Sequence, residues 1–374
     1  MSFHPFVMER WQSTWENRVR YNLSESGVHP MSAAELLKLA GADAATALDP
    51  RLGYPQSNGS DELRAAIAAL YPGATPDNVL VTSGSAEANF STCWRLLEPG
   101  ARVVIVLPAY MQTHGLAQTF GAQVTGLHLR DDLGWQPDPA DIDRTITAGT
   151  KLVVVTNPNN PSGAVMAPDI MDRIAAAANR VGAWLLADEV YQGAERSGKT
   201  TASFWGKAER LVVVNGLSKA YGLPGLRIGW AVTSPEMAED LWSRKDYTTI
   251  GPTVISEALA RLALRPGVRP RIFERTRGII RANWTVVEEW LRSLDGEFRW
   301  RAPDAGAIVW AAYSMKANSS ALAEELRVRQ DVLIVPGDQF GMDGYIRVGF
   351  GSPDHELREA LGRVATIFRG QAVG

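Results

Sequence analysis

Short apolar runs rich in β-branched residues alternate with amphipathic helical patterns through the middle of the chain. The runs are apolar almost throughout, which is typical of strands that are buried on both faces of a sheet. They occupy residues 78–82, 102–108, 151–156, 183–188, 211–216 and 228–233. Helical patterns, such as residues 87–97 and 168–180, lie between them. This alternation predicts an α/β domain with a mostly parallel sheet.

The pattern changes after about residue 270. Residues 274–293 form one long amphipathic pattern, and three apolar runs and a last helical pattern follow it, at residues 307–312, 332–336, 345–350 and 354–369. The N-terminal residues also lack the strand-helix rhythm. We therefore predict a large α/β domain of residues 46–270 and a smaller α+β domain built from residues 1–45 plus 271–374.

The composition argues against several classes of protein. The 374 residues carry a formal net charge of -3 and contain no cluster of Lys and Arg, so we predict no nucleic-acid partner. Cys93 is the only cysteine, which excludes an intrachain disulfide, and we predict no metal site. The N-terminus has no apolar leader, and no apolar run reaches the ~20 residues of a membrane span. We expect a cytoplasmic protein with no membrane partner.

Polar clusters follow the ends of the predicted strands. They are the sequences TSGSAE, PAY, NPNNPSG, DEVY and GLSKAYGLPGLR, which begin at residues 82, 108, 157, 188 and 216. Taken alone, each has an ordinary structural explanation, such as a helix cap, a turn, a buried carboxylate or a surface lysine. Ligands of open α/β sheets bind at the carboxyl ends of the strands, so the clusters together indicate one site.

The order and spacing of these clusters resemble those of fold-type I pyridoxal 5'-phosphate (PLP) enzymes, and among them the class I/II aminotransferase family. The match runs from Asn22 to Arg347 and beyond, and it rests above all on NPNNPSG, DEVY and SKAYGLPGLRIGW. It implies PLP as the cofactor and a fold-type I PLP transferase, with a mostly parallel seven-stranded sheet in the large domain. The N-terminal segment is also similar to members of specialised metabolism, capreomycidine synthases among them.

The resemblance implies the catalytic roles. Lys219 would bind PLP as a Schiff base and later move the substrate's α-proton, and burial beside cationic groups is expected to help its amine lose charge. Asp188 would pair with the pyridine nitrogen, so that the ring can accept electrons. Tyr191 and Asn160 would hydrogen-bond the phenolic oxygen of the cofactor, and Tyr110 would stack on its ring.

The resemblance also implies a site for the cofactor's phosphate. Arg227 matches the family's phosphate arginine, whose guanidinium suits a dianion. Gly84, Ser85 and Ala86 would offer backbone N–H groups and a hydroxyl at the start of a helix. Tyr54 resembles a tyrosine that reaches the phosphate from the neighbouring subunit, which implies a homodimer with shared active sites.

One position departs from the family pattern. Many relatives carry a hydroxyl residue three positions before the lysine, where it contacts the phosphate. Gly216 occupies that position here. Ser218, directly before the lysine, is the candidate replacement for this one contact.

Three residues are candidates for substrate binding. Arg347, in YIRVGF, resembles the arginine that binds a substrate α-carboxylate through two parallel hydrogen bonds. The alternative is an ordinary surface arginine on an edge strand. Gly27, in SESGV, matches the glycine loop that closes over that carboxylate, and Asn160 is expected to contribute to the same site.

These residues leave more than one reaction open. The resemblance favours an aminotransferase that acts on an α-amino acid and passes the amino group to a keto acid in a ping-pong cycle. The alternative is a PLP enzyme of β- or γ-elimination, replacement or cyclisation, because one carbanionic intermediate serves all of these reactions. The PLP-binding domain of a transcription regulator is disfavoured, since such proteins carry an additional N-terminal DNA-binding domain.

Overall fold

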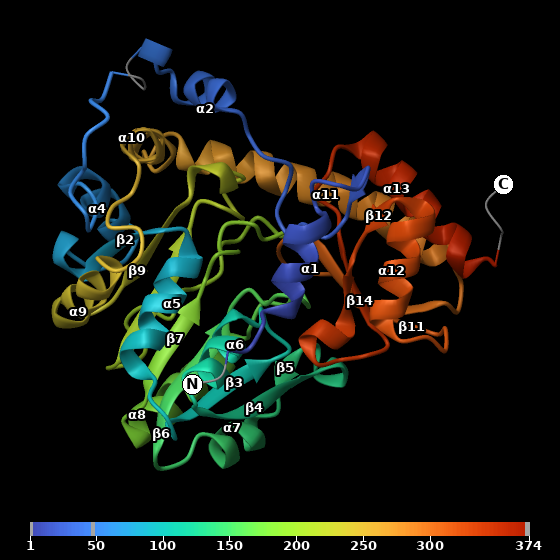
Figure 1. Ribbon diagram of the computed structural model, residues 1–374, viewed down its shortest axis with the longest axis horizontal. Coiled ribbons are helices and arrows are strands. Elements are labelled where there is room, and N and C mark those ends of the chain that lie inside the picture. The colour runs from blue at the N-terminus through green and yellow to red at the C-terminus, as the bar shows by residue number, and fades with distance from the viewer. Residues whose placement is uncertain (1–2, 46–48, 371–374) are drawn as a thin grey trace.

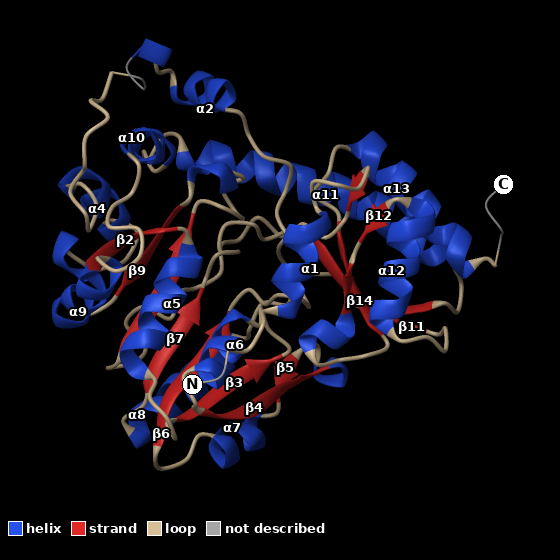
Figure 2. Cartoon of the chain, viewed as in Figure 1, coloured by secondary structure: helices blue, strands red, loops and turns tan. Residues whose placement is uncertain are grey.

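The computed structural model describes residues 3–45 and 49–370, and its centre is an eight-stranded sheet (Figures 1 and 2). In spatial order the strands are β2 (Val79–Ser83), β9 (Ile228–Val232), β8 (Leu211–Gly216), β7 (Trp184–Asp188), β6 (Thr150–Thr156), β3 (Arg102–Leu107), β4 (Gln123–Arg130) and β5 (Gln136–Pro137). The five strands from β8 to β4 run parallel. β9 is antiparallel to both of its neighbours, and β5 is antiparallel to β4.

The prediction of a mostly parallel sheet is confirmed, whereas the predicted number of seven strands is too low by the two-residue edge strand β5. Strand β4, Gln123–Arg130, is a second strand that the apolar runs do not predict. Exposed and buried residues mix along β4, because β5 pairs only with Leu129 and Arg130. The rest of β4 pairs with β3 alone and therefore lies at the edge of the sheet. It therefore lacks the continuous apolar run that marks the central strands.

Two hydrophobic cores cover the two faces of this sheet. Successive residues of a strand point to opposite faces, and in β6 Leu152 and Val154 belong to one core while Val153 and Val155 belong to the other. Helices α5 (Ser85–Leu96), α6 (Gln112–Thr119) and α9 (Pro235–Lys245) contribute to the first core. The second core includes α4 (Asp61–Ala68), α7 (Pro139–Thr145), α8 (Pro168–Val181) and α10 (Val254–Ala263).

The C-terminal part of the chain forms a separate antiparallel sheet. Its order is β10 (Phe298–Trp300), β11 (Ile308–Tyr313), β14 (Tyr345–Gly349) and β13 (Val335–Pro336). The long helix α11 (Arg269–Ser293) leads to this sheet, and α12 (Ser319–Gln330) and α13 (Asp354–Phe368) pack together beside it (Figure 1). The predicted strand at residues 332–336 is in fact two short strands in different sheets, since β12 (Val332–Leu333) pairs elsewhere.

The N-terminal segment packs on this C-terminal part. Strand β1 (Tyr21–Asn22) pairs in parallel with β12, and helix α1 (Val7–Trp15) contacts β13. Helix α2 (Ala33–Ala40) instead packs on α10. The division into domains at residues 45/46 and 270/271 stays a prediction, and the first boundary adjoins residues 46–48, which lie outside the described residues.

The described residues also include four short 3-10 helices: η1 (Pro76–Asn78), η2 (Asp131–Leu133), η3 (Pro224–Leu226) and η4 (Gly337–Phe340). Among the described residues, no helix is long and apolar enough to cross a membrane. No group of His, Cys, Asp and Glu in the described part of the chain is arranged to hold a metal ion.

A close backbone approach fixes the start of helix α5 against the sheet. Gly229 of β9 pairs with Thr82 on one side and with Gly216 on the other. A Cβ atom on Gly229 would lie 2.3 Å from the carbonyl carbon of Gly84 and from the backbone nitrogen of Ser85. Only glycine therefore lets the turn between β2 and α5 pass this closely over β9.

We predict that Gly229→Ala destabilises the protein, because its methyl group collides with the backbone of the turn at Gly84. Overpacking of this kind costs about 1–3 kcal/mol, which urea unfolding will measure. Gly225→Ala is the matched control, since a Cβ atom there meets nothing within 4 Å. Equal unfolding free energies for the two variants would contradict the close approach.

Candidate active site

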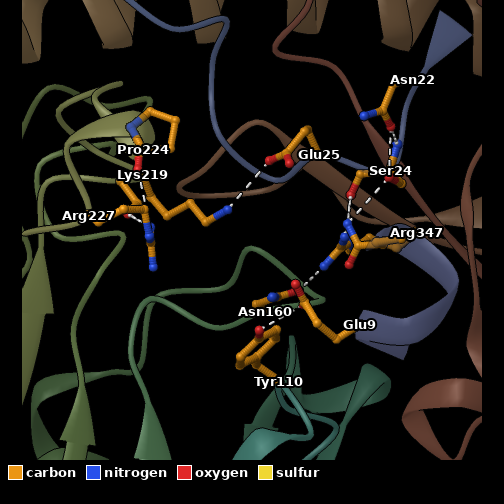
Figure 3. A network of polar contacts seen from close by, with 12 residues as sticks. Glu9, Asn22, Ser24, Glu25, Tyr110, Asn160, Lys219, Pro224, Arg227 and Arg347 are labelled. Carbon is orange, nitrogen blue, oxygen red and sulfur yellow. Dashed lines mark hydrogen bonds and ion pairs between the residues drawn. The ribbon is translucent and has the colours of Figure 1, made fainter. Parts of the chain in front are cut away.

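Lys219 lies just after strand β8, beside the N-terminal segment (Figure 3). Its Nζ is 3.5 Å from Oε2 of Glu25. Gly27 is in ordinary contact with the lysine stem, because a Cβ atom at Gly27 would lie 3.6 Å from Cδ of Lys219. The structure therefore brings two predicted site residues, Lys219 and Gly27, together from distant parts of the chain.

The electrostatic surroundings of Lys219 differ from the expectation. Burial lowers the pKa of the Lys219 amine most strongly, and the Arg347 guanidinium lowers it further. The carboxylate of Glu25 and the phenol of Tyr191 act in the opposite direction, and the net pKa is raised. In return, the Lys219 charge lowers the pKa of Glu25. The surroundings of Lys219 without a bound cofactor therefore keep its amine charged.

Asp188 ends strand β7 as a buried carboxylate. Its Oδ2 accepts a hydrogen bond of 3.0 Å from Nδ2 of Asn89, and its Oδ1 accepts one of 3.2 Å from the backbone N–H of Val190. Burial raises its pKa, although both hydrogen bonds oppose the rise. No Lys, Arg or His among the described residues forms an ion pair with it. A buried carboxylate in this position fits a protonated ring nitrogen as its missing partner.

The aromatic residues Tyr110 and Tyr191 line the same region. The hydroxyl of Tyr110 donates a hydrogen bond of 2.9 Å to Oε2 of Glu9, and the ring of Phe6 meets the Tyr110 ring edge to face at 5.0 Å. Burial raises the pKa of Tyr110, and the nearby Glu9 carboxylate raises it further. Tyr191 is buried, with its ring against the backbone of Gly306.

Arg347 of strand β14 is fully buried, with 1% of its surface exposed. Its Nη1 donates a hydrogen bond of 2.9 Å to Oδ1 of Asn160, and its Nη2 donates one to the backbone carbonyl of Ser24 (Figure 3). Its Nε has no partner among the described residues, and no carboxylate there forms an ion pair with it. The alternative of a surface arginine is therefore excluded, and the free donor fits an anionic ligand.

The predicted phosphate residues converge at the start of α5. Arg227 lies against Gly84, where an added Cβ atom would be 2.3 Å from Nη2 of the arginine. The Arg227 Nη1 is 3.5 Å from Oγ of Ser218 and donates a hydrogen bond of 3.1 Å to the carbonyl of Pro224. Helix α5 begins at Ser85, with Gly84 as its N-cap and Ala86 in its first turn. A guanidinium and a helix N-terminus side by side fit a phosphate dianion.

The packing explains the departure at Gly216. A Cβ atom there would lie 3.0 Å from the carbonyl oxygen of Ile228 and 3.1 Å from Cα of Gly229. The close pairing of β8 with β9 therefore leaves little room for a hydroxyl side chain at this position. The hydroxyl of Ser218 lies 3.5 Å from Nη1 of Arg227 and therefore stays the candidate replacement.

With this geometry in place, comparison with known proteins identifies the family. Residues 23–364 match the family of class I and II aminotransferases. The chain belongs to this family. The predictions of the family, of fold type I and of PLP as the cofactor are thereby confirmed.

The proteins that this chain resembles include aminotransferases and a PLP-dependent cyclase. The chain is 32% identical to capreomycidine synthase from Streptomyces vinaceus, over 96% of this chain and 92% of that protein. It is 28% identical to aspartate/prephenate aminotransferase from Thermus thermophilus, over 90% and 87%. The structure matches a PLP-dependent aminotransferase from Streptococcus suis with a TM-score of 0.92 at 28% identity, covering 100% of both chains. It matches the PLP-dependent cyclase OrfR with a TM-score of 0.91 at 29% identity, covering 100% and 99%.

Two features of this aminotransferase lie outside the cluster. Tyr54 is 91% exposed and therefore packs on none of the other candidate residues of its own chain. A separate cavity of about 860 Å³ lies between residues 195–202 and helix α11, and none of the candidate residues lines it. The other candidates thus converge on one candidate active site, whereas the side chain of Tyr54 is exposed.

Sequence reasoning missed four residues that belong to this active site. Glu25 and Ser24 are neighbours of Gly27 and contact Lys219 and Arg347, while Glu9 and Asn89 hold Tyr110 and Asp188. The only available signal was the position of Glu25 and Ser24 within the quoted SESGV motif. Glu9 and Asn89 lie on helices, where nothing in the sequence distinguishes them from ordinary polar residues.

Glu189, next to Asp188, is a further buried acid. Its Oε1 accepts hydrogen bonds of 2.7 Å from the backbone N–H of Phe204 and 3.0 Å from the hydroxyl of Ser203. Its Oε2 has no partner among the described residues. Burial raises the pKa of Glu189 to about 8, and the Asp188 charge adds to the rise. At neutral pH Glu189 is therefore protonated, and Asp188 has no second negative charge beside it.

We predict that Glu189→Gln gains stability over the wild type as the pH rises. The raised pKa of Glu189 contributes fully to the free energy of unfolding below the ordinary pKa of a glutamate. This contribution is lost as the pH rises toward about 8. Glutamine does not titrate, so the variant should gain on the order of 1–4 kcal/mol relative to wild type between about pH 5 and pH 9. Thermal unfolding across this range measures the difference.

Glu35→Gln is the control for this titration. Glu35 is exposed, and hydrogen bonds from Ser32 lower its pKa, so it stays ionised over the whole range. Its difference from the wild type should be constant with pH. A constant difference for Glu189→Gln as well would show that Glu189 is not protonated in the folded protein.

Proposed function

We propose that this enzyme transfers the amino group of an α-amino acid to a keto acid, with Lys219 as the residue that holds PLP. The observation that carries the proposal is a complementary set of unsatisfied charges around Lys219. Among the described residues, the buried carboxylate of Asp188 and the buried guanidinium of Arg347 each form no ion pair, and Nε of Arg347 has no hydrogen-bond partner. PLP and an α-amino acid would supply the two missing partners, a protonated ring nitrogen and a carboxylate.

When bound, PLP supplies an electron sink that stabilises negative charge at the substrate's α-carbon. The residues around it would then have separate tasks. Asp188, oriented by Asn89, would keep the ring nitrogen protonated, and Tyr110 would lie against the ring. Tyr191 and Asn160 would hydrogen-bond the phenolic oxygen. Gly84, Ser85, Ala86, Ser218 and Arg227 would bind the phosphate.

Lys219 would also move the proton of the substrate's α-carbon. Its Nζ must first lose a proton, because a charged amine is neither a nucleophile nor a base. Glu25 Oε2, at 3.5 Å from Nζ, stabilises the charged amine and has a lowered pKa, so it opposes this loss and does not accept the proton. Gly27, in contact with the lysine stem, would let the N-terminal segment lie close over the substrate carboxylate.

We further infer a homodimer in which Tyr54 reaches the phosphate site of the second subunit. Tyr54 is 91% exposed, and Leu52 beside it is 81% exposed, which supports a subunit contact at this segment. A cytoplasmic location and the domain boundaries at residues 45/46 and 270/271 stay predictions from the sequence.

A second candidate function is PLP-dependent cyclisation, elimination or replacement. It is favoured by the 32% identity to a capreomycidine synthase over nearly the whole chain and by the likeness to the cyclase OrfR. The two candidates differ in their products. A panel of amino acids offered without a keto acid would give the aminated cofactor and a keto acid in a transaminase, but ammonia or a cyclised product in the alternative.

We predict that borohydride reduction of the PLP-bound enzyme attaches the cofactor to Lys219 alone. Reduction makes the bond between the cofactor and the amine permanent, so peptide mapping identifies the residue. Lys219→Ala is expected to leave no label. Lys245 is the internal control, since it is fully buried but donates its hydrogen bonds to the backbone carbonyls of Ser57 and Ile250. A label on any lysine other than Lys219 would refute the assignment.

We also predict that Arg347→Lys lowers kcat/KM for α-amino acids by about one to three powers of ten. A lysine cannot offer a carboxylate two parallel hydrogen bonds, and the loss of a charge-assisted pair is worth about 1.5–3 kcal/mol. The PLP content should not change. Arg358→Lys, at an exposed ion pair with Asp354, is the matched control. An unchanged kcat/KM in Arg347→Lys would remove the carboxylate role.

A further inference from the structure

The loop of residues 246–251 is exposed but held in a strained conformation. Ile250 has φ +63°, a left-handed conformation that is rare for a β-branched residue and costs of order 1–3 kcal/mol. The fully buried Lys245 holds it there, since its Nζ donates hydrogen bonds of 2.5 Å to the carbonyl of Ile250 and 2.9 Å to that of Ser57. Strain of this kind persists only where the surrounding structure fixes the backbone.

Glu87 connects this loop to the turn at the start of helix α5. Its buried carboxylate accepts a hydrogen bond of 2.6 Å from the backbone N–H of Ser83, which ends strand β2. On the other side it accepts hydrogen bonds from the hydroxyls of Thr248 and Thr249, the latter at 2.8 Å, and from the backbone N–H of Thr249 at 3.3 Å. One carboxylate therefore fixes both the turn before Gly84 and the loop.

The loop of residues 246–251 also carries exposed apolar side chains. Tyr247 is 81% exposed and Ile250 is 48% exposed. Gly251 lies against Pro55 and Ser57, so the loop adjoins the segment that carries the exposed Leu52 and Tyr54. Exposed large apolar side chains on two adjoining segments fit a surface for association. The occupant that the proposed function supplies is a second copy of this chain.

We propose that Glu87 is a positioning residue that couples the phosphate-binding turn to the subunit-contact loop. The inference rests on the proposed function, in which Gly84–Ala86 bind the cofactor's phosphate. Phosphate binding fixes the turn, the turn fixes the carboxylate through Ser83, and the carboxylate fixes Thr248 and Thr249. Because such coupling is reciprocal, association of the second copy strengthens PLP binding by the same factor by which PLP strengthens association.

The first measurement compares PLP with pyridoxal, which lacks the phosphate, by absorbance titration of each protein. Glutamine at position 87 keeps one acceptor oxygen but places an NH₂ group against N–H and hydroxyl donors. We expect Glu87→Gln to raise the PLP dissociation constant by about 10-fold to 100-fold, as for loss of a charged hydrogen bond. The pyridoxal dissociation constant should change by less than about 3-fold, since only the phosphate senses the turn.

Glu257→Gln is the matched control for loss of a buried carboxylate in the same region. Glu257 is 4% exposed and accepts a hydrogen bond of 2.8 Å from the backbone N–H of Ser60, and among the described residues it has no hydrogen bond to Ser83, Thr248 or Thr249. Its PLP dissociation constant should stay within about 3-fold of that of the wild type. Equal losses of PLP and pyridoxal binding in Glu87→Gln would reduce Glu87 to a purely structural role and overturn the coupling.

A double-mutant cycle tests whether the loop acts through Glu87. Thr248 and Thr249 are both exposed, so Thr248→Val with Thr249→Val should leave the fold intact. We expect this pair of substitutions to weaken PLP binding about 5-fold or more in the wild type and to have no effect when combined with Glu87→Gln. An effect that persists undiminished in the Glu87→Gln background would mean that the threonines act without Glu87, and the proposal would fail.

Sedimentation gives the reciprocal measurement. PLP should tighten association of two wild-type chains by about 5-fold to 150-fold. In Glu87→Gln only the part that Tyr54 supplies through its direct contact with the phosphate should remain, so the gain should be smaller. An undiminished gain in the variant contradicts the coupling. A wild-type protein that binds PLP no better than pyridoxal would instead refute the phosphate site of the proposed function, and with it the basis of this inference.

Discussion

The active site depends on the backbone contact between the N-terminal segment and the end of strand β14. Gly349 donates a hydrogen bond of 2.7 Å to the carbonyl of Leu23, and His29 donates one of 2.7 Å to that of Gly351. A Cβ atom at Gly349 would lie 1.9 Å from the carbonyl oxygen of Glu25. Two glycines thus let the segment lie directly on the strand that carries Arg347. Together with the hydrogen bonds from Leu23 to Leu333 and from Met31 to Gly222, this contact fixes Ser24, Glu25 and Gly27 relative to Lys219.

This contact also helps to bring the charged groups of the candidate site together. The N-terminal segment brings Glu25 to Lys219 and the Ser24 carbonyl to Arg347, while Asp188 is held from helix α5 through Asn89. Burying a charge without a partner is costly, so each of these groups indicates a ligand of the opposite sign or a proton that must move. Arg347 is oriented by Asn160 and Ser24 before any ligand is bound, which lowers the entropic cost of orienting a carboxylate.

The central strands could be predicted because they are apolar without interruption, and the family motifs could be predicted because each follows such a strand. The failures have physical reasons. Exposed residues interrupt β4, and residues 332–336 read as one apolar run although β12 pairs with β1 and β13 with β14. The raised pKa of Lys219 could not be foreseen, because Glu25 is nearly 200 positions away along the chain and only the fold brings it close.

The same arrangement bears on the choice between transamination and cyclisation. Both reactions would begin with loss of the proton on the substrate's α-carbon, so the groups that accept and return protons after that step would decide the outcome. In the proposed function Arg347 would hold the α-carboxylate in either reaction, and Arg347 is itself fixed by Asn160, which follows a strand of the large sheet, and by Ser24 from the N-terminal segment. The aminotransferases and cyclases that this chain resembles share its fold. We therefore infer that the reaction type is set less by the large sheet than by the segment of residues 9–27, whose carboxylates face Lys219 and Tyr110.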